Sequence, residues 1–307
     1  MTTTSTAVVI VSGGSAISPF TTPDAGCTQG QAAGSSDTFL RAGLLAAGFE
    51  VFTSPASPTG VADADPGFAG FSGPPEILPA ELTVNPVGPL DDAGACLARF
   101  LGHLATRYGY GEFHLVGHSM GGLFSRAALR VLATEGSPLP VRSLTTLGTP
   151  WTGAFAADHR LGDLTRDAIG GDERVEALLA GLAEEASGLP KDNAADQVTH
   201  SYLAGPAGWN ERQAGVLDDL EVTLLAGELL SWTSAAGRKV SPNDGLVATA
   251  SALAEEVSAA VLPRRVSRTF PDAHSVFFCD LLGLPWERAL TWDPDVLDAV
   301  IGAINRQ

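Results

Sequence analysis

Residues 113–122 read F-H-L-V-G-H-S-M-G-G, and this stretch decides how the rest of the sequence is interpreted. An apolar run ends at Val116, a serine follows between two glycines, and a run of helical character begins near Met120. Glycines at these positions let a strand and a helix approach each other closely across a sharp turn. The G-x-S-x-G pattern over residues 117–121 is typical of a strained strand-to-helix turn that exposes a nucleophilic serine. We therefore predict such a turn with Ser119 at its apex.

The elements around this stretch alternate between strands and helices. Short apolar runs predict strands, and apolar positions spaced three and four residues apart predict helices. The predicted strands are residues 7–11, 49–53, 113–116, 141–147, 221–226 and 265–270. The predicted helices are residues 35–47, 90–107, 123–132 and 294–304. This order predicts an α/β fold with a mostly parallel central sheet and helices on both faces, formed by a single domain over residues 1–307.

Two segments interrupt the alternation. Residues 54–88 are rich in proline and show no periodicity, which predicts a long loop of the kind that often lines a site. Residues 152–219 are polar and rich in glycine, with one predicted helix over 173–185. We interpret this second segment as a cap-like insertion over the edge of the sheet, within the same domain.

The composition argues against several classes of protein. The 35 acidic and 18 basic residues give a formal net charge of −17, which repels nucleic acid and anionic lipid. No apolar stretch approaches the roughly 20 residues of a membrane span, and the run 7–11 is too short for a signal peptide. We expect a soluble chain, either cytoplasmic or secreted with its leader removed. Cys27, Cys96 and Cys279 allow one disulfide or none, and the oligomeric state is not predicted.

A serine nucleophile needs a base and an acid that orients the base. In chains with this type of turn, the acid and then the histidine follow the serine. Of the six histidines, only His274 lies in a loop just after the last predicted strand. Glu228 comes directly after the strand 221–226, and Asp244 lies in the turn-rich run 241–251. Both carboxylates remain candidates on position alone.

Two main-chain N–H groups are expected to stabilise the oxyanion that a serine attack creates. The first is the N–H of Met120, which follows the serine. The second belongs to the loop after the first strand, where residues 12–15 read S-G-G-S. Because glycine readily adopts the positive φ that turns an N–H toward a ligand, we assign the second donor to Gly14.

The sequence resembles bacterial lipases of the α/β-hydrolase fold at three short motifs. These are the G-H-S-M-G-G turn, the run L-G-T-P-W-T-G at 147–153, and N-D-G-L-V at 243–247. The resemblance implies that Ser119 is the nucleophile, Asp244 the acid and His274 the base, with a cap over an acyl pocket and no cofactor. Ser12-Gly13 stands where many such lipases have His-Gly, and Trp151 stands where a histidine is common. No carboxylate cluster identifies the structural calcium site of related lipases.

We therefore expect a serine hydrolase that cleaves carboxylic esters of small molecules or lipids through an acyl-enzyme intermediate. An acyltransferase or thioesterase, a cofactor-free peroxidase, and a non-catalytic binding protein are the alternatives, because a fold alone does not fix function. Trp151, Phe68 and Phe71 are the expected substrate contacts, and Ile77, Leu78, Leu203 and Trp209 are further apolar side chains near the mouth. Each of these fits a core position equally well.

Overall fold

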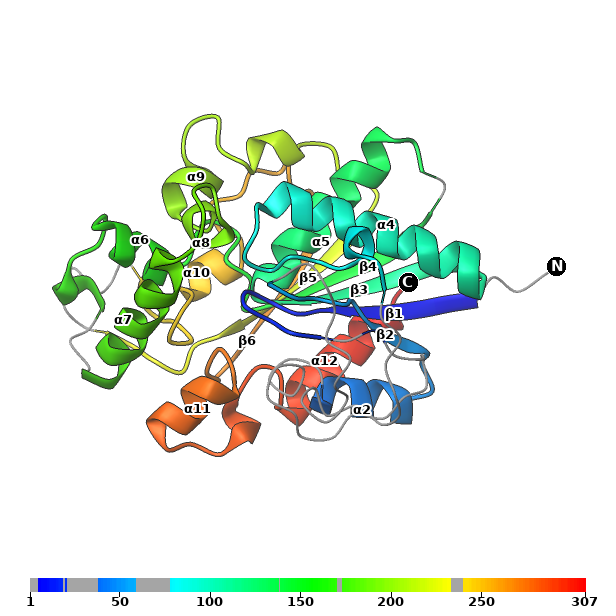
Figure 1. Cartoon of the computed structure of the whole chain (residues 1–307). Coiled ribbons are helices and arrows are strands. Elements are labelled where there is room, and N and C mark those ends of the chain that lie inside the picture. Colours follow the sequence, from blue (N-terminus) through cyan, green and yellow to red (C-terminus); the bar gives the residue numbers. More distant parts are fainter. Residues whose placement is uncertain are drawn as a thin grey trace.

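One sheet of six parallel strands forms the centre of the molecule (Figure 1). The computed structural model describes residues 5–18, 20, 38–58, 78–137, 139–169, 173–232 and 240–307. The strand order is β2-β1-β3-β4-β5-β6. The strands are β1 (Ser5–Val11), β2 (Val51–Thr53), β3 (Tyr110–His118), β4 (Val141–Leu147), β5 (Glu221–Gly227) and β6 (Arg265–Phe270).

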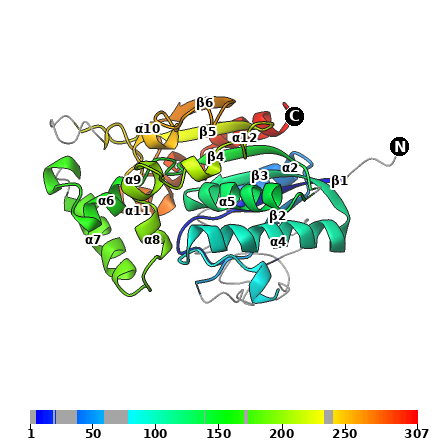
Figure 2. The ribbon, with the colours of Figure 1, turned by 90° about the horizontal axis from the view of Figure 1, so that it is seen from above.

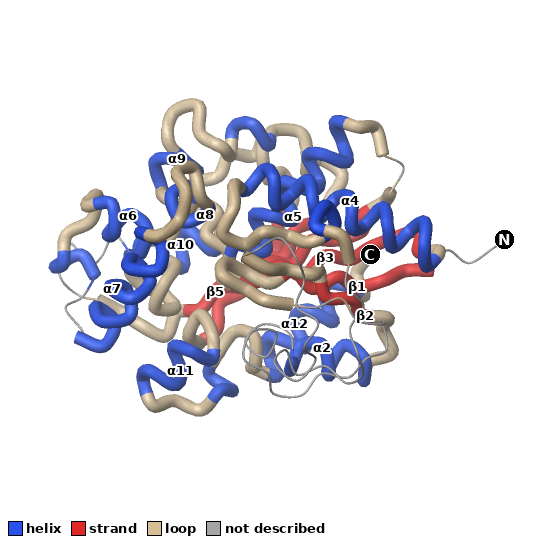
Figure 3. The backbone as a smooth tube through the Cα atoms, viewed as in Figure 1, coloured by secondary structure: helices blue, strands red, loops and turns tan. Residues whose placement is uncertain are grey.

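Helices cover both faces of this sheet, as the predicted α/β architecture requires (Figure 3). The helices of the main layers are α2 (Thr38–Ala46), α4 (Leu90–Tyr108), α5 (Met120–Thr134) and α12 (Pro294–Ile304). The remaining helical segments are η1 (Ala80–Leu82), α6 (Phe155–Leu161), η2 (Arg166–Ile169), α7 (Glu173–Ser187), α8 (Ala194–Gln197), α9 (His200–Ala204), η3 (Glu211–Gln213), α10 (Thr249–Ala252), α11 (Val276–Leu282) and η5 (Trp286–Arg288).

The side chains of β1 divide the core into two layers. Ala7, Val9 and Val11 pack toward α4 and α5, whereas Val8 and Ile10 pack toward α2 and α12. Alternation along a strand sends neighbouring side chains to opposite faces, so a strand buried on both faces is apolar at every position. Figure 1 shows α4 and α5 on one side of the sheet and α2 and α12 on the other. Full burial of each such aliphatic side chain contributes about 1.5–3 kcal/mol.

Most predicted elements occur at the predicted positions. The strands at 141–147 and 265–270 and the helix at 294–304 have the predicted bounds. The strand predicted at 113–116 extends over the whole of β3, and the helix predicted at 123–132 begins three residues earlier, at the first residue after the turn. Helix α11 was not predicted, because its seven residues are too few to show a helical period.

The segment predicted as a cap folds into short helices at one end of the sheet (Figure 2). The helix predicted at 173–185 is α7. Its buried side chains Val175 and Leu179 form a small apolar cluster with Phe155, Ile169 and Val240, separate from the two layers beside β1.

The described residues also bear on the cysteines and on membrane insertion. Cys96 and Cys279 are free thiols, while Cys27 lies outside the described residues. Within the described ranges, no helix combines the length and the apolar character that crossing a bilayer requires.

Candidate active site

The turn after β3 holds Ser119 in an unusual backbone conformation. Its φ is 55° and its ψ is −130°, a region that residues with a side chain rarely adopt. Its N–H donates to the Leu147 carbonyl at 2.8 Å, and Thr149 Oγ1 donates to the Ser119 carbonyl at 2.8 Å. The last residue of β4 and the loop after it therefore hold both main-chain polar groups of Ser119, which stabilises the strained turn.

The glycines of the motif are required by close backbone approach. A Cβ built on Gly121 would lie 1.9 Å from the Val11 carbonyl oxygen, and one built on Gly117 would lie 2.5 Å from the Gly122 nitrogen. Both distances are far below van der Waals contact, and the neighbouring atoms belong to the backbone and cannot turn away. A side chain at 117 would force β3 and the start of α5 apart, and a side chain at 121 would force α5 away from the end of β1. This steric requirement explains the residue pattern from which the turn was predicted.

His274 lies in the loop after β6 and approaches Ser119 directly. Its Nε2 lies 2.9 Å from the Ser119 Oγ, although 155 positions separate the two residues in the sequence. The parallel sheet brings them together, because β3 and β6 both end at the same edge. His274 is buried, with 3% of its surface exposed. The serine hydroxyl can therefore donate its hydrogen bond to the imidazole.

Asp244 lies on the other side of the same imidazole. Its Oδ2 is 2.7 Å from His274 Nδ1, and because a carboxylate only accepts, Nδ1 carries the hydrogen. The other oxygen, Oδ1, accepts the N–H groups of Leu246 at 3.0 Å and Val247 at 2.7 Å. The N-D-G-L-V run thus forms a tight turn whose own amides fix the carboxylate. Glu228, the second candidate acid, is exposed.

Gly148, just after β4, lies beside the pair formed by Asp244 and His274. Its φ is +56°, and a Cβ there would lie 3.0 Å from both Asp244 Oδ2 and His274 Nδ1. In the sequence, the L-G-T-P run is informative only through the resemblance to lipases. The structure shows why its glycine is needed, since a side chain would press on the hydrogen bond between acid and base.

Of the two expected oxyanion donors, Met120 directly follows Ser119, whereas Gly14 lies against Met120. Met120 is the first residue of α5, and the first N–H groups of a helix have no partner within the helix. A Cβ on Gly13 would lie 2.7 Å from the Ser119 Cβ, whereas one on Gly14 would lie 2.8 Å from Met120 Sδ. The Gly-rich loop after β1 therefore borders the serine, with Gly13 against its side chain and Gly14 against the next residue.

Some of the expected substrate contacts lie outside the described residues, and the others are buried. Phe68, Phe71 and Ile77 lie outside the described residues. Trp151 is fully buried, its Nε1 donates to Thr146 Oγ1 at 3.2 Å, and the Arg126 guanidinium lies 4.1 Å from its ring centre. Such a side chain presents no surface to a substrate, so its position matches the core alternative. The same holds for Leu78, Leu203 and Trp209, which are all buried.

The other histidines make separate contacts. His114 Nδ1 pairs with Ser143 Oγ at 2.8 Å, and His159 Nδ1 pairs with the Leu164 carbonyl at 3.0 Å. His118 contacts the main chain of the loop that carries the proposed base: its Nε2 lies 2.9 Å from the His274 carbonyl oxygen. Within the described ranges, no group of three or more His, Cys, Asp or Glu residues could hold a metal ion.

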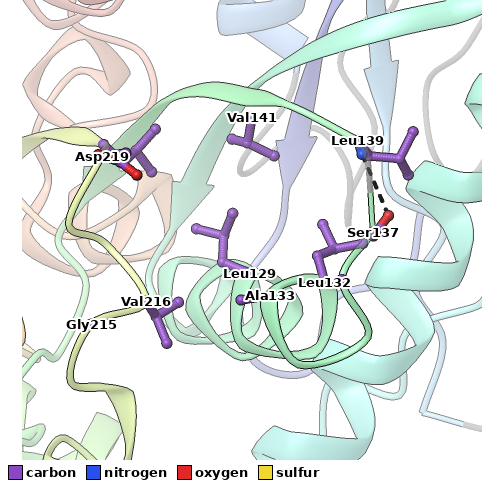
Figure 4. A pocket seen from close by; sticks show the side chains of 11 residues that line it. Leu129, Leu132, Ala133, Ser137, Leu139, Val141, Gly215, Val216 and Asp219 are labelled. Atoms are coloured by element: carbon purple, nitrogen blue, oxygen red, sulfur yellow. Dashed lines mark hydrogen bonds between the residues drawn. The ribbon is translucent and has the colours of Figure 1, made fainter.

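Two cavities lie apart from these residues. One of about 430 Å³ lies beside the C-terminal half of α5, where Leu129, Leu132 and Val141 line it (Figure 4). A second of about 700 Å³ lies between the segment predicted as a cap and residues 240–256, with Phe155, His200 and Val240 among its lining residues. Ser119, Asp244 and His274 line neither cavity. Neither therefore identifies the substrate pocket.

Known proteins resemble this chain in fold. A family model described as the alpha/beta hydrolase fold matches residues 64–215. The mature form of the lipase BlEst2 from Bacillus licheniformis is 17% identical, with 91% of this chain and 93% of the lipase covered and a TM-score of 0.53. The product of a Listeria innocua gene is 18% identical, with 99% of this chain and 95% of that chain covered and a TM-score of 0.50. No curated protein sequence matches the chain.

The topology, the helical layers and these similarities lead to one conclusion. Six parallel strands with helices on both faces are the predicted architecture, and the family match and the similar lipase fold agree with it. The chain has the α/β-hydrolase fold and resembles bacterial lipases of that fold.

Proposed function

We propose that this chain is a serine hydrolase that cleaves carboxylic esters through a triad of Ser119, His274 and Asp244. One observation carries the proposal: a continuous chain of short hydrogen bonds runs from the Asp244 carboxylate through both ring nitrogens of His274 to the Ser119 hydroxyl. The distances of 2.7 and 2.9 Å lie within the range that direct proton transfer requires. The strained backbone of Ser119 adds support, since this conformation exposes a nucleophile.

The first half of the reaction forms the acyl-enzyme. Ser119 Oγ attacks the ester carbonyl carbon while His274 Nε2 takes its proton. The carbonyl oxygen becomes an oxyanion, and the N–H groups of Met120 and Gly14 stabilise it. When the tetrahedral intermediate collapses, the imidazolium gives its proton to the departing alkoxide, so the alcohol leaves neutral.

The second half repeats these steps with water. His274 takes a proton from a water molecule, which attacks the acyl carbon, and returns that proton to Ser119 Oγ as the acid departs. Asp244 holds the imidazole in the tautomer with hydrogen on Nδ1 and stabilises the imidazolium that forms twice in each cycle. This cycle requires no cofactor.

The proposed substrates are carboxylic esters of small molecules or lipids. The resemblance to bacterial lipases supports an acyl ester, and residues 152–219 are proposed to cover the acyl pocket as a cap within the single domain. An acyltransferase or thioesterase would use the same triad with another acceptor or leaving group, so substrate assays must separate these activities.

The test is a panel of p-nitrophenyl esters of rising chain length, run beside acyl-CoA thioesters, with Ser119→Ala as the key variant. We expect Ser119→Ala to lose at least about 1,000-fold in kcat. Ser187→Ala, at the exposed end of α7, serves as the matched control and should keep full activity. Equal activity of Ser119→Ala and the parent protein, or no hydrolysis of any ester, would contradict the proposal. Turnover of thioesters alone would favour the thioesterase.

A further inference from the structure

His118 binds the main chain of His274. Its Nε2 lies 2.9 Å from the His274 carbonyl oxygen. A carbonyl oxygen only accepts hydrogen bonds, so Nε2 of His118 carries a hydrogen and donates it. The two imidazole rings lie 4.9 Å apart between their centres, at an angle of 41°. The residue that precedes the proposed nucleophile therefore contacts the proposed base.

His118 remains neutral throughout the ordinary pH range. It is buried, with 5% of its surface exposed, and burial lowers its pKa to about 3, an effect to which the nearby His274 ring adds. A neutral ring does not repel the imidazolium that forms on His274 during the reaction. It also does not compete with His274 for the proton of Ser119.

The peptide of His274 is held from both sides. Its N–H donates to the Asp244 carbonyl oxygen at 2.8 Å, and its C=O accepts from His118 at 2.9 Å. The first contact ties the loop after β6 to the turn that carries the acid. The second ties the same loop to the end of β3, in the middle of the sheet.

This second contact has a direct geometric consequence. His118 is bonded covalently to Ser119 and by hydrogen bond to His274, so one residue connects both partners of the 2.9 Å contact between Oγ and Nε2. Without it, the His274 carbonyl would lose its hydrogen bond to the end of β3, while the preceding residue, Ala273, would stay bonded to the Arg288 carbonyl at 2.8 Å and to the Leu290 N–H at 3.0 Å. A shift of about 1 Å in such a contact can cost up to about 100-fold in rate.

We propose that His118 is a positioning residue that sets the approach of the His274 imidazole to the Ser119 hydroxyl by donating a hydrogen bond to the His274 main chain. This inference rests on the proposed esterase function. The competing interpretation is a buried histidine that only fills space at the end of β3. A positioning residue needs a hydrogen-bond donor at the Nε2 position of residue 118, whereas a space-filling residue needs only the volume of the ring.

The test uses His118→Leu and His118→Gln beside a matched control on the same strand. Leucine fills similar space without a donor, whereas the amide nitrogen of glutamine reaches about as far as imidazole Nε2. His114 is the control, because it is also buried on β3 and its Nδ1 pairs with the hydroxyl of Ser143 on the neighbouring strand. For each variant, kcat and KM for one p-nitrophenyl ester and the midpoint of urea unfolding are measured.

We expect His118→Leu to lower kcat by about 10- to 100-fold with KM nearly unchanged, and His118→Gln to recover most of the loss. His114→Leu should keep kcat within about 2-fold of the parent value, since His114 does not contact His274. We expect this even if its midpoint of urea unfolding falls as far as that of His118→Leu. Equal kcat values for His118→Leu and His114→Leu would overturn the proposal. So would a His118→Gln variant that folds and is as slow as His118→Leu.

A measurement on the unaltered protein covers the case in which the variants do not fold. Heteronuclear NMR of the imidazoles should show His118 neutral, with its hydrogen on Nε2, from about pH 5 to about pH 8. A His118 that titrates in this range, or carries its hydrogen on Nδ1, would refute the inference. Failure of the proposed function is recognised separately: Ser119→Ala would then match the parent, whatever the His118 variants do.

Discussion

The turn at Ser119 and the segment 152–219 are built by different means. In the turn, backbone meets backbone so closely that only glycine fits at 117 and 121. Around α7, in the segment 152–219, helices pack through side chains, Leu161 and Leu182 remain exposed, and Gly181 has open space around it. The turn therefore requires glycine at two positions, whereas the part of the segment around α7 leaves room for larger residues. A site that needs sub-ångström geometry lies in the first kind of structure.

Contacts of long side chains attach the segment 152–219 to α4 and α5, which cover one face of the sheet. Trp209 Nε1 donates to Asp91 Oδ1 at 2.7 Å, and Arg126 Nη2 donates to Asn210 Oδ1 at 2.8 Å. The Arg126 guanidinium also lies over the rings of both Trp151 and Trp209. These contacts fix one part of the segment, around residue 209, onto α4 and α5. The part around α7 packs instead on its own small apolar cluster.

The largest difference between the proposed site and the segment 152–219 should appear when a carboxylate is neutralised. Asp244→Asn should lower kcat by about 1,000- to 10,000-fold, because the amide no longer fixes the tautomer of His274. Asp196→Asn removes a comparably short contact in the segment 152–219, to Arg160 at 2.6 Å, and should leave kcat unchanged. Steady-state kinetics on one ester measures both.

The same assay decides which acid serves the base. Glu228→Gln should keep nearly full activity, since Glu228 is exposed. A slow Glu228→Gln beside an active Asp244→Asn would transfer the role of the acid to Glu228.

A smaller and purely structural difference is expected from glycine replacements. Gly121→Ala should destabilise the fold by about 3 kcal/mol or more, because its Cβ would meet the Val11 carbonyl oxygen at 1.9 Å. Gly181→Ala, in α7 with open space around it, should stabilise by about 0.5–1 kcal/mol. Urea unfolding of both variants measures the contrast. A well-folded Gly121→Ala would show that the close approach is not obligatory.

Buried carboxyl groups provide a third contrast, through pH. Burial and then the neighbouring Asp293 raise the pKa of Asp272, two residues before His274, to about 8. The folded chain therefore keeps a proton that the unfolded chain releases above about pH 4, so this contribution to stability is present below about pH 4 and is lost as the pH rises to about 8. Asp272→Asn cannot ionise, so it should remove this pH dependence of the free energy of unfolding. At alkaline pH its free energy of unfolding should exceed that of the parent by on the order of a few kcal/mol.

The matched replacement in the segment 152–219 is Asp158→Asn. Burial also raises the pKa of Asp158, but its Oδ1 accepts the His200 N–H at 2.8 Å, which opposes the rise. Its effect on the pH slope should therefore be smaller. Unfolding free energies across the pH range test this, and parallel curves for Asp272→Asn and the parent would contradict it.

The smallest effect is expected where the segment 152–219 is attached. Trp209→Phe removes the hydrogen bond to Asp91 and part of a buried ring, at a cost of roughly 1–3 kcal/mol. Because Trp209 does not contact the proposed triad, kcat should stay within about 2-fold of the parent value. A folded Trp209→Phe variant whose kcat falls by more than about 2-fold would show that this contact affects the site.

The same contrast explains what the sequence could predict. The glycines around Ser119 reveal a backbone requirement that is local in the chain, so the turn and the flanking elements were predictable. His274 followed from its order along the chain. Asp244 could not be chosen over Glu228 without the resemblance to lipases, because both follow β5.

The features of the site that were missed depend on contacts between segments far apart in the sequence. The role of Gly148 appears only when Asp244 and His274 are placed beside it, and His118 meets the His274 carbonyl across 156 positions. Trp151 was offered as a substrate contact because an aromatic residue after a strand suits either a pocket or a core. Its burial by Arg126 depends on α5, which the local sequence does not reveal.

The central claim is that Ser119 is a nucleophile activated by His274. The most direct measurement is intact-protein mass spectrometry and peptide mapping after treatment with a fluorophosphonate. We expect a single phosphonyl adduct on Ser119, no adduct in Ser119→Ala, and labelling at least about 100-fold slower in His274→Gln. An unlabelled parent protein, or an adduct on a different serine, would contradict it.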